Sequence, residues 1–439
     1  MTRLLDSLMD EALAAARPQR YGQVTQMVGM SIEVAGISAA IGDGLLLLTG
    51  DGQVHAEVVA IRDDKVVCLA FGEITGLRAG TRVIALGGPL SVRVGPGLLG
   101  RILDGFGMPI DDGPAISGYD VSVAGVPPHP LRRGVVSEQL PLGVRVLDGL
   151  IPCGKGQRLG IFAGSGVGKS SLMSMITRGT SADVSVVALI GERGREVAEL
   201  IERDLGPEGL ERSVVLVATS DAPAVMRIRA AFTATRIAEW FRDQGNDVLL
   251  MMDSLTRFAM AQREVGLAAG EPPATRGYPP SVFGLLPRLL ERAGRSEKGS
   301  ITGLYTVLVE GDDMNEPIAD TARSILDGHI QLSRALAESN HYPAVDVLGS
   351  ISRVAPAVAR KEHLKAGGVI RELLAAWRDA KDLIEIDAYV PGTNHVVDRA
   401  VRIKPKIDAF CRQGLTEVTN LEAALQGLTA IVSSDEPAQ

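Results

Sequence analysis

The chain begins with a helical spacing of apolar residues. Apolar side chains at positions 4, 5, 8, 9, 12 and 13 recur every three to four residues, and Pro18 follows them. This spacing predicts an amphipathic helix within residues 1–20, because a proline inside a helix removes a hydrogen bond and ends the pattern. Such a helix can pack on its own domain or dock a partner, and the pattern leaves both readings open.

From residue 22 to residue 86 the pattern changes to short alternating or apolar runs separated by turn signals such as Gly42-Asp43-Gly44. The runs cover residues 23–34, 45–49, 55–61, 66–71 and 82–86. Closely spaced strands without a long helix predict a small closed β-barrel over residues 21–95. Residues 96–143 are rich in Gly and Pro, which indicates an extended linker.

In residues 144–355 apolar strands alternate with helical patterns, which is typical of a largely parallel sheet flanked by helices. Candidate strands cover residues 159–163, 184–190, 213–219, 248–252, 304–309 and 329–332. Helical spacing returns in residues 356–430, and we expect the polar residues 431–439 to be a disordered tail. The predicted fold class is therefore α/β, with an N-terminal β-barrel and a C-terminal helical domain.

Composition narrows the functional classes. The net charge of −8 and the aromatic content of 4% argue against a nucleic-acid surface of basic patches and stacking rings. The cysteines Cys68, Cys153 and Cys411 fit no metal or redox spacing, which favours a reducing compartment and a cytoplasmic location. No apolar run approaches the roughly 18 to 20 residues that span a bilayer, so we expect membrane contact through partner proteins.

A glycine-rich loop follows the first candidate strand of the sheet and opens a predicted helix. It reads Gly164-Ser165-Gly166-Val167-Gly168-Lys169-Ser170-Ser171. Glycines let backbone N–H groups turn toward phosphate oxygens, and the positive end of the helix adds to the attraction. Lys169 can neutralise the β- and γ-phosphates, while the Ser170 hydroxyl suits Mg²⁺. The loop predicts a nucleoside triphosphate site; the alternative is a glycine-rich surface turn.

Acidic residues follow two other candidate strands. Asp253 ends the strand 248–252, and we expect it to hold Mg²⁺ if its strand neighbours the one before the loop, because ligands bind at the carboxyl ends of such strands. Glu192 follows the strand 184–190 and is the candidate to orient or deprotonate a water, with Arg193 offering charge to the phosphate. The residues alone also permit two alternatives, an ordinary strand-end Asp at position 253 and a solvated charge cluster around Glu192.

Two further residues are candidates for a nucleotide site. Arg353 follows a strand-like run and can stabilise the charge on a transferred phosphoryl group, although it is one arginine among many. Tyr342, next to Pro343, can stack on a base, although an ordinary packed tyrosine is the default interpretation.

Together these motifs resemble the hexameric ATPases related to the catalytic and non-catalytic subunits of rotary ATP synthases, over nearly the whole chain. Five segments look like the protein-secretion branch, and most of all like the flagellum-specific ATPase of the type III export apparatus. They are residues 191–197, 219–227, 251–259, 266–283 and 309–318. The virulence-type secretion ATPases are similar and remain the alternative.

The resemblance implies a RecA-like P-loop core and a homohexamer that hydrolyses MgATP to ADP and phosphate at subunit interfaces, helping to unfold or release export substrates. It also implies residue roles. These are the phosphate loop for Lys169 and Ser170, the catalytic carboxylate for Glu192, a phosphate-facing arginine for Arg193, the Mg²⁺ aspartate for Asp253, base stacking for Tyr342 and an arginine donated across the interface for Arg353.

The resemblance also implies partners. The N-terminal helix resembles the segment that binds a stator-like regulator, and the C-terminal domain resembles the surface for a stalk protein and chaperone–cargo complexes. Contact with the membrane export gate would be indirect, as a peripheral protein. The C-terminal wall of the adenine site matches no motif here, with Tyr389 a candidate contributor.

Two other classes of protein are weighed against this reading. A non-catalytic, ATP-binding subunit would not need Glu192, whereas this chain carries both Glu192 and Arg353 and can build a complete site by self-association. A nucleic-acid translocase of the Rho type shares the core but needs stacking aromatics and a basic groove in its N-terminal domain. Residues 22–86 contain a single aromatic residue, Phe71, and no basic cluster.

Overall fold

A computed structural model describes residues 21–434 except residues 51, 310 and 312. The described residues form two compact units. One runs to Leu90 and includes Glu264–Pro272, and the other comprises Ser91–Arg263 and the residues from Pro273 onward. The helix predicted over residues 1–20 and residues 435–439 of the predicted tail lie outside the described residues.

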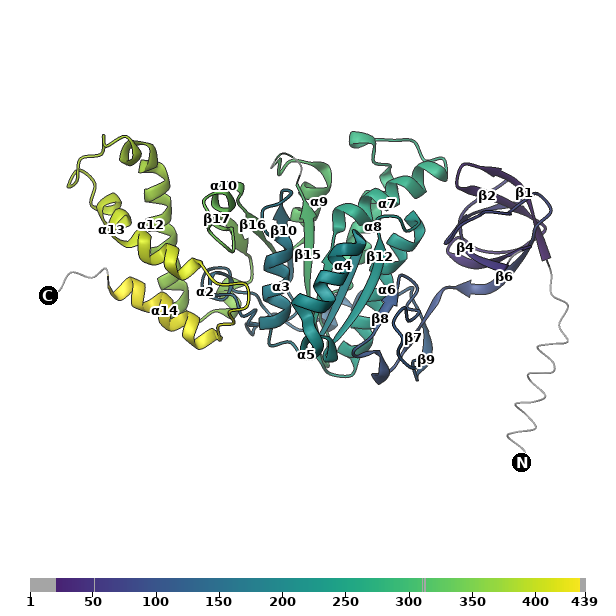
Figure 1. The fold of residues 1–439 in the computed structure, drawn as a ribbon, viewed down its shortest axis with the longest axis horizontal. Coiled ribbons are helices and arrows are strands. Elements are labelled where there is room, and N and C mark those ends of the chain that lie inside the picture. The colour runs from purple at the N-terminus through teal and green to yellow at the C-terminus, as the bar shows by residue number, and fades with distance from the viewer. Residues whose placement is uncertain (1–20, 51, 310, 312, 435–439) are drawn as a thin grey trace, which may run out of the picture. The chain divides into compact units, whose positions relative to one another are not determined.

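Six antiparallel strands close the smaller unit into a barrel in the order β1-β2-β5-β4-β3-β6 (Figure 1). They are β1 (Tyr21–Val28), β2 (Ser31–Ala35), β3 (Asp43–Thr49), β4 (Gly52–Arg62), β5 (Lys65–Ala70) and β6 (Arg82–Pro89). Ile32 and Val34 are buried inside while their neighbours face outward, as the pleat requires. The predicted barrel is confirmed, but the run 23–34 forms two strands, joined by a turn in which Gly29 has a φ of 59°.

The larger unit is built on a sheet in which eight strands follow the order β17-β16-β10-β15-β13-β11-β12-β8 (Figure 1). Neighbours on this path are parallel, except that β17 runs antiparallel to β16. The short strand β14 (Gly294–Arg295) pairs with β15. The eight are β8 (Ile102–Asp104), β10 (Arg158–Ala163), β11 (Val184–Glu192), β12 (Ser213–Thr219), β13 (Asp247–Asp253), β15 (Ser300–Leu308), β16 (Gly328–Leu332) and β17 (Val345–Ser352).

Helices alternate with these strands along the chain, and several of them pack against the sheet (Figure 1). They are α2 (Arg145–Leu150), α3 (Lys169–Gly179), α4 (Gly194–Glu199), α5 (Gly206–Glu211), α6 (Ala224–Asp243), α7 (Leu255–Ala268), α8 (Pro280–Leu290), α9 (Pro317–Ile325), α10 (Arg334–Glu338) and α11 (Ala355–Val358). Every residue of β11 is buried, as expected for a parallel strand that is covered on both sides. The predicted parallel sheet is confirmed.

The stretch expected as a linker contributes to the sheet. Strand β8 extends the sheet beside β12, and β9 (Tyr119–Ser122) pairs with β7 (Ser91–Val94). The sequence pattern did not reveal β8, because three residues between Gly- and Pro-rich flanks show no periodicity.

Three C-terminal helices share one apolar core with the sheet. They are α12 (Lys361–Glu385), α13 (His395–Cys411) and α14 (Leu421–Ser433), so α14 includes the first three residues of the expected tail. Asn394 and Asn420 cap α13 and α14 by accepting backbone N–H groups. Leu373 and Ile407 belong to the same buried cluster as Leu172 of α3. Contacts with α2 and this shared cluster therefore tie the three helices to the sheet.

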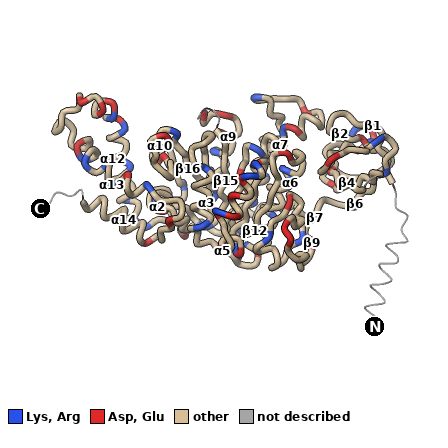
Figure 2. The backbone as a smooth tube through the Cα atoms, in the orientation of Figure 1, with Lys and Arg blue, Asp and Glu red and all other residues tan. Residues whose placement is uncertain are grey.

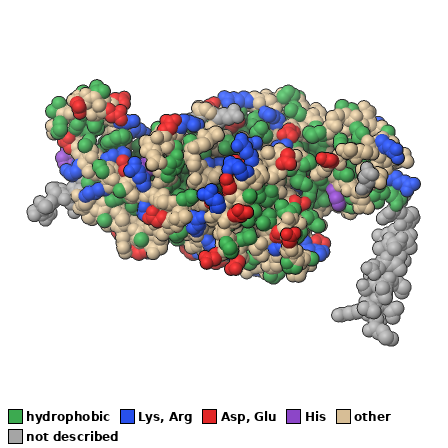
Figure 3. All heavy atoms as spheres, in the orientation of Figure 1, with side chains coloured by type: hydrophobic (Ala, Val, Ile, Leu, Met, Phe, Trp, Pro, Cys, Tyr) green, Lys and Arg blue, Asp and Glu red, His purple; other side chains and the backbone are tan. Residues whose placement is uncertain are grey.

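Charges are spread over the surface. Lys and Arg are interspersed with Asp and Glu along the backbone in Figure 2, and the face in Figure 3 shows the two signs mixed. Within the part of the chain that the structure describes, no helix combines the length and the apolar composition needed to cross a membrane.

A buried ion pair joins α6 to the segment that directly follows α8. The guanidinium of Arg292 donates to both carboxylate oxygens of Glu239 at 2.7 Å and to the Val123 carbonyl at 3.1 Å. Arg292 is 1% exposed and Glu239 is 2% exposed. Such a pair makes each partner depend on the other, because an isolated buried charge is strongly unfavourable.

We expect Arg292→Met to lower the unfolding free energy by about 3 kcal/mol, because among the described residues it leaves Glu239 with Arg236 alone as a charged partner. The double variant Arg292→Met/Glu239→Leu should regain much of this loss. Urea unfolding measures both, with Arg93→Met, in an exposed pair with Asp120, as the control that changes little. Equal losses in the single and double variants would contradict the interpretation.

Candidate nucleotide site

The phosphate loop lies between β10 and α3. Gly166 and Gly168 have φ angles of 78° and 95°, in the left-handed region that favours glycine. Helix α3 begins at Lys169, so its unpaired N–H groups face the loop. Ser170 and Ser171 are exposed at the start of this helix. Sequence and structure together form a concave set of donors suited to phosphate oxygens.

Three charged side chains meet above this loop. Lys169 Nζ forms an ion pair with Asp253 Oδ1 and lies 3.8 Å from Glu192 Oε1. Glu192 is 7% exposed and Asp253 is 5% exposed. The sequence made the convergence of Asp253 with the loop conditional on neighbouring strands, and β10 and β13 are not neighbours, because β15 lies between them. The residues still converge because the long lysine side chain crosses the width of that strand.

Thr306 on β15 is a member of this cluster that the sequence reading missed. Its hydroxyl donates to Asp253 Oδ1 at 2.6 Å, and the residue is fully buried. In the sequence, a threonine among the apolar residues of a strand gives no indication of a functional role. Only the position of β15 between β10 and β13 shows that its hydroxyl faces the aspartate.

The environment of Glu192 holds its pKa at about 7. Burial is the main cause of the raised pKa, and the negative charge of Asp253 is the second; Lys169 opposes them, and Glu196 adds to the rise. Among the described residues, Oε1 of Glu192 is buried without a hydrogen-bond partner. A carboxylate with a pKa near neutrality and a free acceptor atom suits a general base.

The residues present fit a magnesium ion. The Ser170 hydroxyl and the Asp253 carboxylate are hard oxygen ligands, and Mg²⁺ in nucleotide sites commonly takes only one or two protein ligands beside phosphates and water. No cluster of three or more His, Cys, Asp or Glu residues that could hold a metal occurs in the described part of the chain. The two side chains that fit the ion are therefore those of Ser170 and Asp253.

Arg353 lies at the end of the sheet where β10 starts, and the phosphate loop lies at the other end, where β10 finishes. Because β17 runs antiparallel to β16, the last residues of β17 lie at the end of the sheet where β10 starts. The Arg353 N–H donates to the Asp327 carbonyl at 3.0 Å, and its side chain is exposed. Arg158, at the start of β10, is roughly 16 Å from Ala163 at about 3.3 Å per residue. Within one chain, the structure does not bring Arg353 to Lys169.

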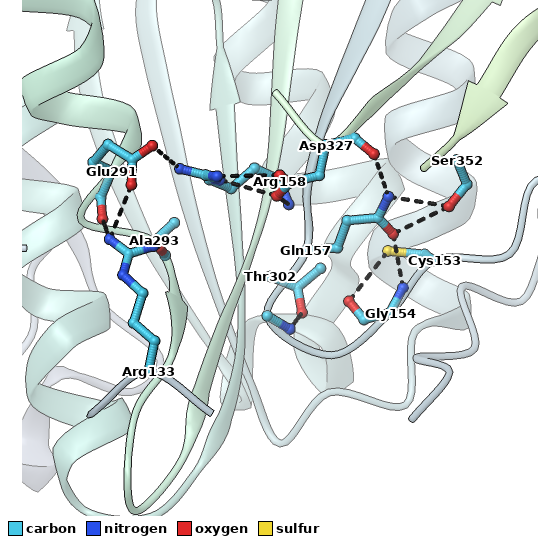
Figure 4. A network of polar contacts seen from close by, with 11 residues as sticks. Arg133, Cys153, Gly154, Gln157, Arg158, Glu291, Ala293, Thr302, Asp327 and Ser352 are labelled. Atoms are coloured by element: carbon cyan, nitrogen blue, oxygen red, sulfur yellow. Dashed lines mark hydrogen bonds and ion pairs between the residues drawn. The ribbon is translucent and has the colours of Figure 1, made fainter. Parts of the chain in front are cut away.

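A polar network fixes this edge (Figure 4). Figure 4 shows Arg158 between Glu291 and Asp327, with Nη1 of Arg158 2.5 Å from the Glu291 carboxylate and Nε 3.0 Å from the Asp327 carboxylate. Gln157 donates to the Asp327 carbonyl at 3.0 Å and to the Ser352 hydroxyl at 3.1 Å. The backbone that precedes Arg353 is thus held from two sides.

The remaining predicted residues occupy different places. Tyr342 is 40% exposed, and a Cβ atom added to Gly168 would lie 3.3 Å from its ring, so the tyrosine borders the phosphate loop. Arg193 is exposed directly after Glu192. Tyr389 lies between α12 and α13, where its hydroxyl donates to Asp398 at 2.9 Å.

Family comparisons match three successive parts of the chain. Residues 143–352 match the nucleotide-binding domain of the ATP synthase alpha/beta family, and residues 22–87 match the beta-barrel domain of that family. Residues 359–430 match the T3SS EscN ATPase C-terminal domain.

Individual relatives match along nearly the full length. The chain is 52% identical to the flagellum-specific ATP synthase of Bacillus subtilis (strain 168), over 95% of this chain and 96% of that protein. It is 50% identical to the type 3 secretion system ATPase of Xanthomonas euvesicatoria, over 98% of each. The assembled ATPase EscN of the enteropathogenic E. coli type III secretion system superimposes with a TM-score of 0.90 at 46% identity, covering 94% of this chain and 100% of that chain. The structure of EscN in complex with its central stalk EscO superimposes with a TM-score of 0.87, at the same identity and coverage.

We expect Thr306→Val to weaken magnesium-dependent nucleotide binding, because Asp253 loses the hydroxyl that orients it. The Mg²⁺ concentration for half-maximal binding of a non-hydrolysable ATP analogue should rise about fivefold to tenfold. Thr306→Ser keeps the hydroxyl and is the matched control, and thermal unfolding checks that both variants fold. An unchanged Mg²⁺ requirement in Thr306→Val would contradict this role.

Proposed function

Because this chain belongs to the ATP synthase alpha/beta family, in the branch of flagellum-specific ATP synthases and type 3 secretion ATPases, we propose that it energises protein export by hydrolysing ATP at sites shared between copies of itself. The family and ATPase activity predicted from the sequence are confirmed. One observation supports the proposal that the sites are shared between copies. Lys169, Glu192 and Asp253 meet at one end of the strands of the sheet, whereas Arg353 is exposed at the opposite end.

The residues at the phosphate loop divide the work of hydrolysis. Lys169 and the loop amides bind the β- and γ-phosphates, and Lys169 exchanges its ion pair with Asp253 for the phosphate oxygens. Ser170 and Asp253 would hold Mg²⁺, which when bound neutralises phosphate charge. Glu192 accepts a proton as water oxygen bonds to the γ-phosphorus and the bond to the bridging oxygen breaks, so that ADP leaves. Arg193 would face the γ-phosphate.

Arg353 of a neighbouring copy would complete the site. Its exposure and its place at the far edge fit donation to the next subunit, where it stabilises the charge on the phosphoryl group. The Asp327 carbonyl and the network in Figure 4 hold its backbone. In a closed ring of identical copies each copy both receives and donates such an arginine, and the homohexamer that the family resemblance implies is such a ring. The matching EscN structures are described as assembled.

Partners and location follow the same family. EscN is known in complex with its central stalk EscO, and we expect a stalk protein to contact the C-terminal helices here. We expect chaperone–cargo complexes at the same domain, a stator-like regulator at residues 1–20, and a peripheral position at the cytoplasmic side of the export gate. Flagellar and virulence relatives match at 52% and 50% identity, so the preference for flagellar export stays a prediction.

The Rho-type alternative loses support in the barrel. Phe71 is 4% exposed and therefore buried away from any base. Tyr21, at the start of β1, is 42% exposed, with Arg82 over its ring at 5.4 Å. A single exposed ring does not form the series of stacking platforms that single-stranded nucleic acid needs.

Mixing two inactive variants tests the shared site. Arg353→Ala should lower turnover about 10³-fold or more, and Glu192→Gln at least 10²-fold. In an equal mixture assembled together, about a quarter of the interfaces would pair an intact Glu192 with an intact Arg353, and turnover should return. Absence of recovery in mixed hexamers, verified by native mass, would contradict donation between subunits. Arg378→Ala, in an exposed arginine of α12, is the control that stays active.

The pKa of Glu192 predicts a pH dependence. A general base must be deprotonated, so kcat/KM should fall as the pH drops through about 7. Glu196→Gln removes a charge that raises this pKa, and it should move the acid limb to lower pH. Comparison of the two enzymes with the same substrate cancels the titration of ATP itself. If kcat/KM fell at the same pH in both enzymes, Glu192 would not be the group that sets this pH dependence.

A further inference from the structure

A buried glutamine joins the C-terminal helices to the nucleotide site. Gln413 follows α13, is 5% exposed, and makes four hydrogen bonds. Its side chain donates to the carbonyls of Gly143 and Glu417, both at 2.8 Å, and accepts from the Arg145 N–H at 2.8 Å. Its backbone N–H donates to the Tyr342 carbonyl at 3.0 Å. We call these five residues the Gln413 junction.

The Gly143 side of the junction is rigid. Gly143 has a φ of 75°, and a Cβ atom there would lie 2.5 Å from Gly179 Cα at the end of α3. Its N–H donates to the buried Asp148 carboxylate at 2.9 Å. Gln413 is therefore bonded to a point that cannot shift without moving the helix that begins at the phosphate loop.

The loop that carries Gln413 is anchored a second time. The Arg145 guanidinium donates to the Phe410 carbonyl at 3.2 Å, to the Arg412 carbonyl at 2.5 Å, and to the Glu417 carboxylate. These bonds hold the connection between α13 and α14 onto the start of α2. The side chain of Gln413 thus fixes its own backbone N–H, the group that bonds Tyr342.

We propose that Gln413 is a positioning residue for the base of the nucleotide: it holds Tyr342 against the phosphate loop and so links base binding to the C-terminal helices. This inference rests on the proposed function, in which Tyr342 stacks on the base. The ring borders Gly168 on one side, and the Tyr342 backbone is bonded to the C-terminal domain on the other. Both N–H donors and the carbonyl oxygen of the side-chain amide are engaged, so an apolar residue of equal length removes three bonds at once.

The test separates base binding from phosphate binding in the full-length enzyme. KM and kcat for ATP are measured beside the inhibition constant of inorganic tripolyphosphate with Mg²⁺, a competitor without a base. Gln413→Met should raise KM for ATP about tenfold, corresponding to about 1.4 kcal/mol, while kcat and the tripolyphosphate constant stay within about twofold. Gln426→Met, in an exposed glutamine of α14, should match the wild type.

Two further variants keep the outcome decisive. If Gln413→Met does not assemble, Gln413→Glu keeps the acceptor for Arg145 but places a carboxylate against two carbonyls, and it should raise KM for ATP in the same way. The positioning role would be overturned if KM for ATP and the inhibition constant of tripolyphosphate rose together, or if KM for ATP did not change. Tyr342→Ala should raise KM for ATP; no rise would instead reject base stacking by Tyr342, while ATP turnover by the wild type still supports the hydrolytic function.

Discussion

The charge of Lys169, held beside two buried carboxylates, is the interaction around which the nucleotide site is arranged. A buried charge needs a partner, and Lys169 has Asp253 in direct contact and Glu192 at 3.8 Å. The strands that deliver these residues must therefore end together, with β15 and its Thr306 between them. Burial of the cluster, helped by the negative charge of Asp253 and opposed by Lys169, raises the pKa of Glu192, which links the stability of the cluster to its chemistry.

The direction of one strand decides how the site is completed. An arginine at the end of a parallel strand would lie near the phosphates of its own chain. Since β17 is antiparallel to β16, Arg353 lies at the far edge and is exposed there. If Arg353 completes the site, as we propose, a second subunit is needed and activity would depend on assembly. The polar network around Arg158 and Asp327 keeps that edge rigid enough to present one side chain accurately.

The C-terminal helices share the apolar core of the sheet and also reach the site through polar contacts. Shared packing makes the larger unit cohesive, whereas hydrogen bonds through Gln413 are directional and respond to small shifts. A partner that displaces these helices would thereby change the environment of Tyr342. Binding of such a partner would then alter nucleotide affinity through the hydrogen bonds of Gln413.

The sequence by itself determined the barrel, the parallel sheet, the phosphate loop and the family, because strand periodicity and a contiguous glycine-rich motif are local properties. It also singled out Glu192, Asp253 and Arg353 as candidates. It missed β8, which is too short to show a period, and Thr306, whose role exists only once β15 lies between β10 and β13. The tertiary structure alone decided strand order and direction, and hence that Arg353 faces away from its own site, because strand pairing joins residues far apart in the chain.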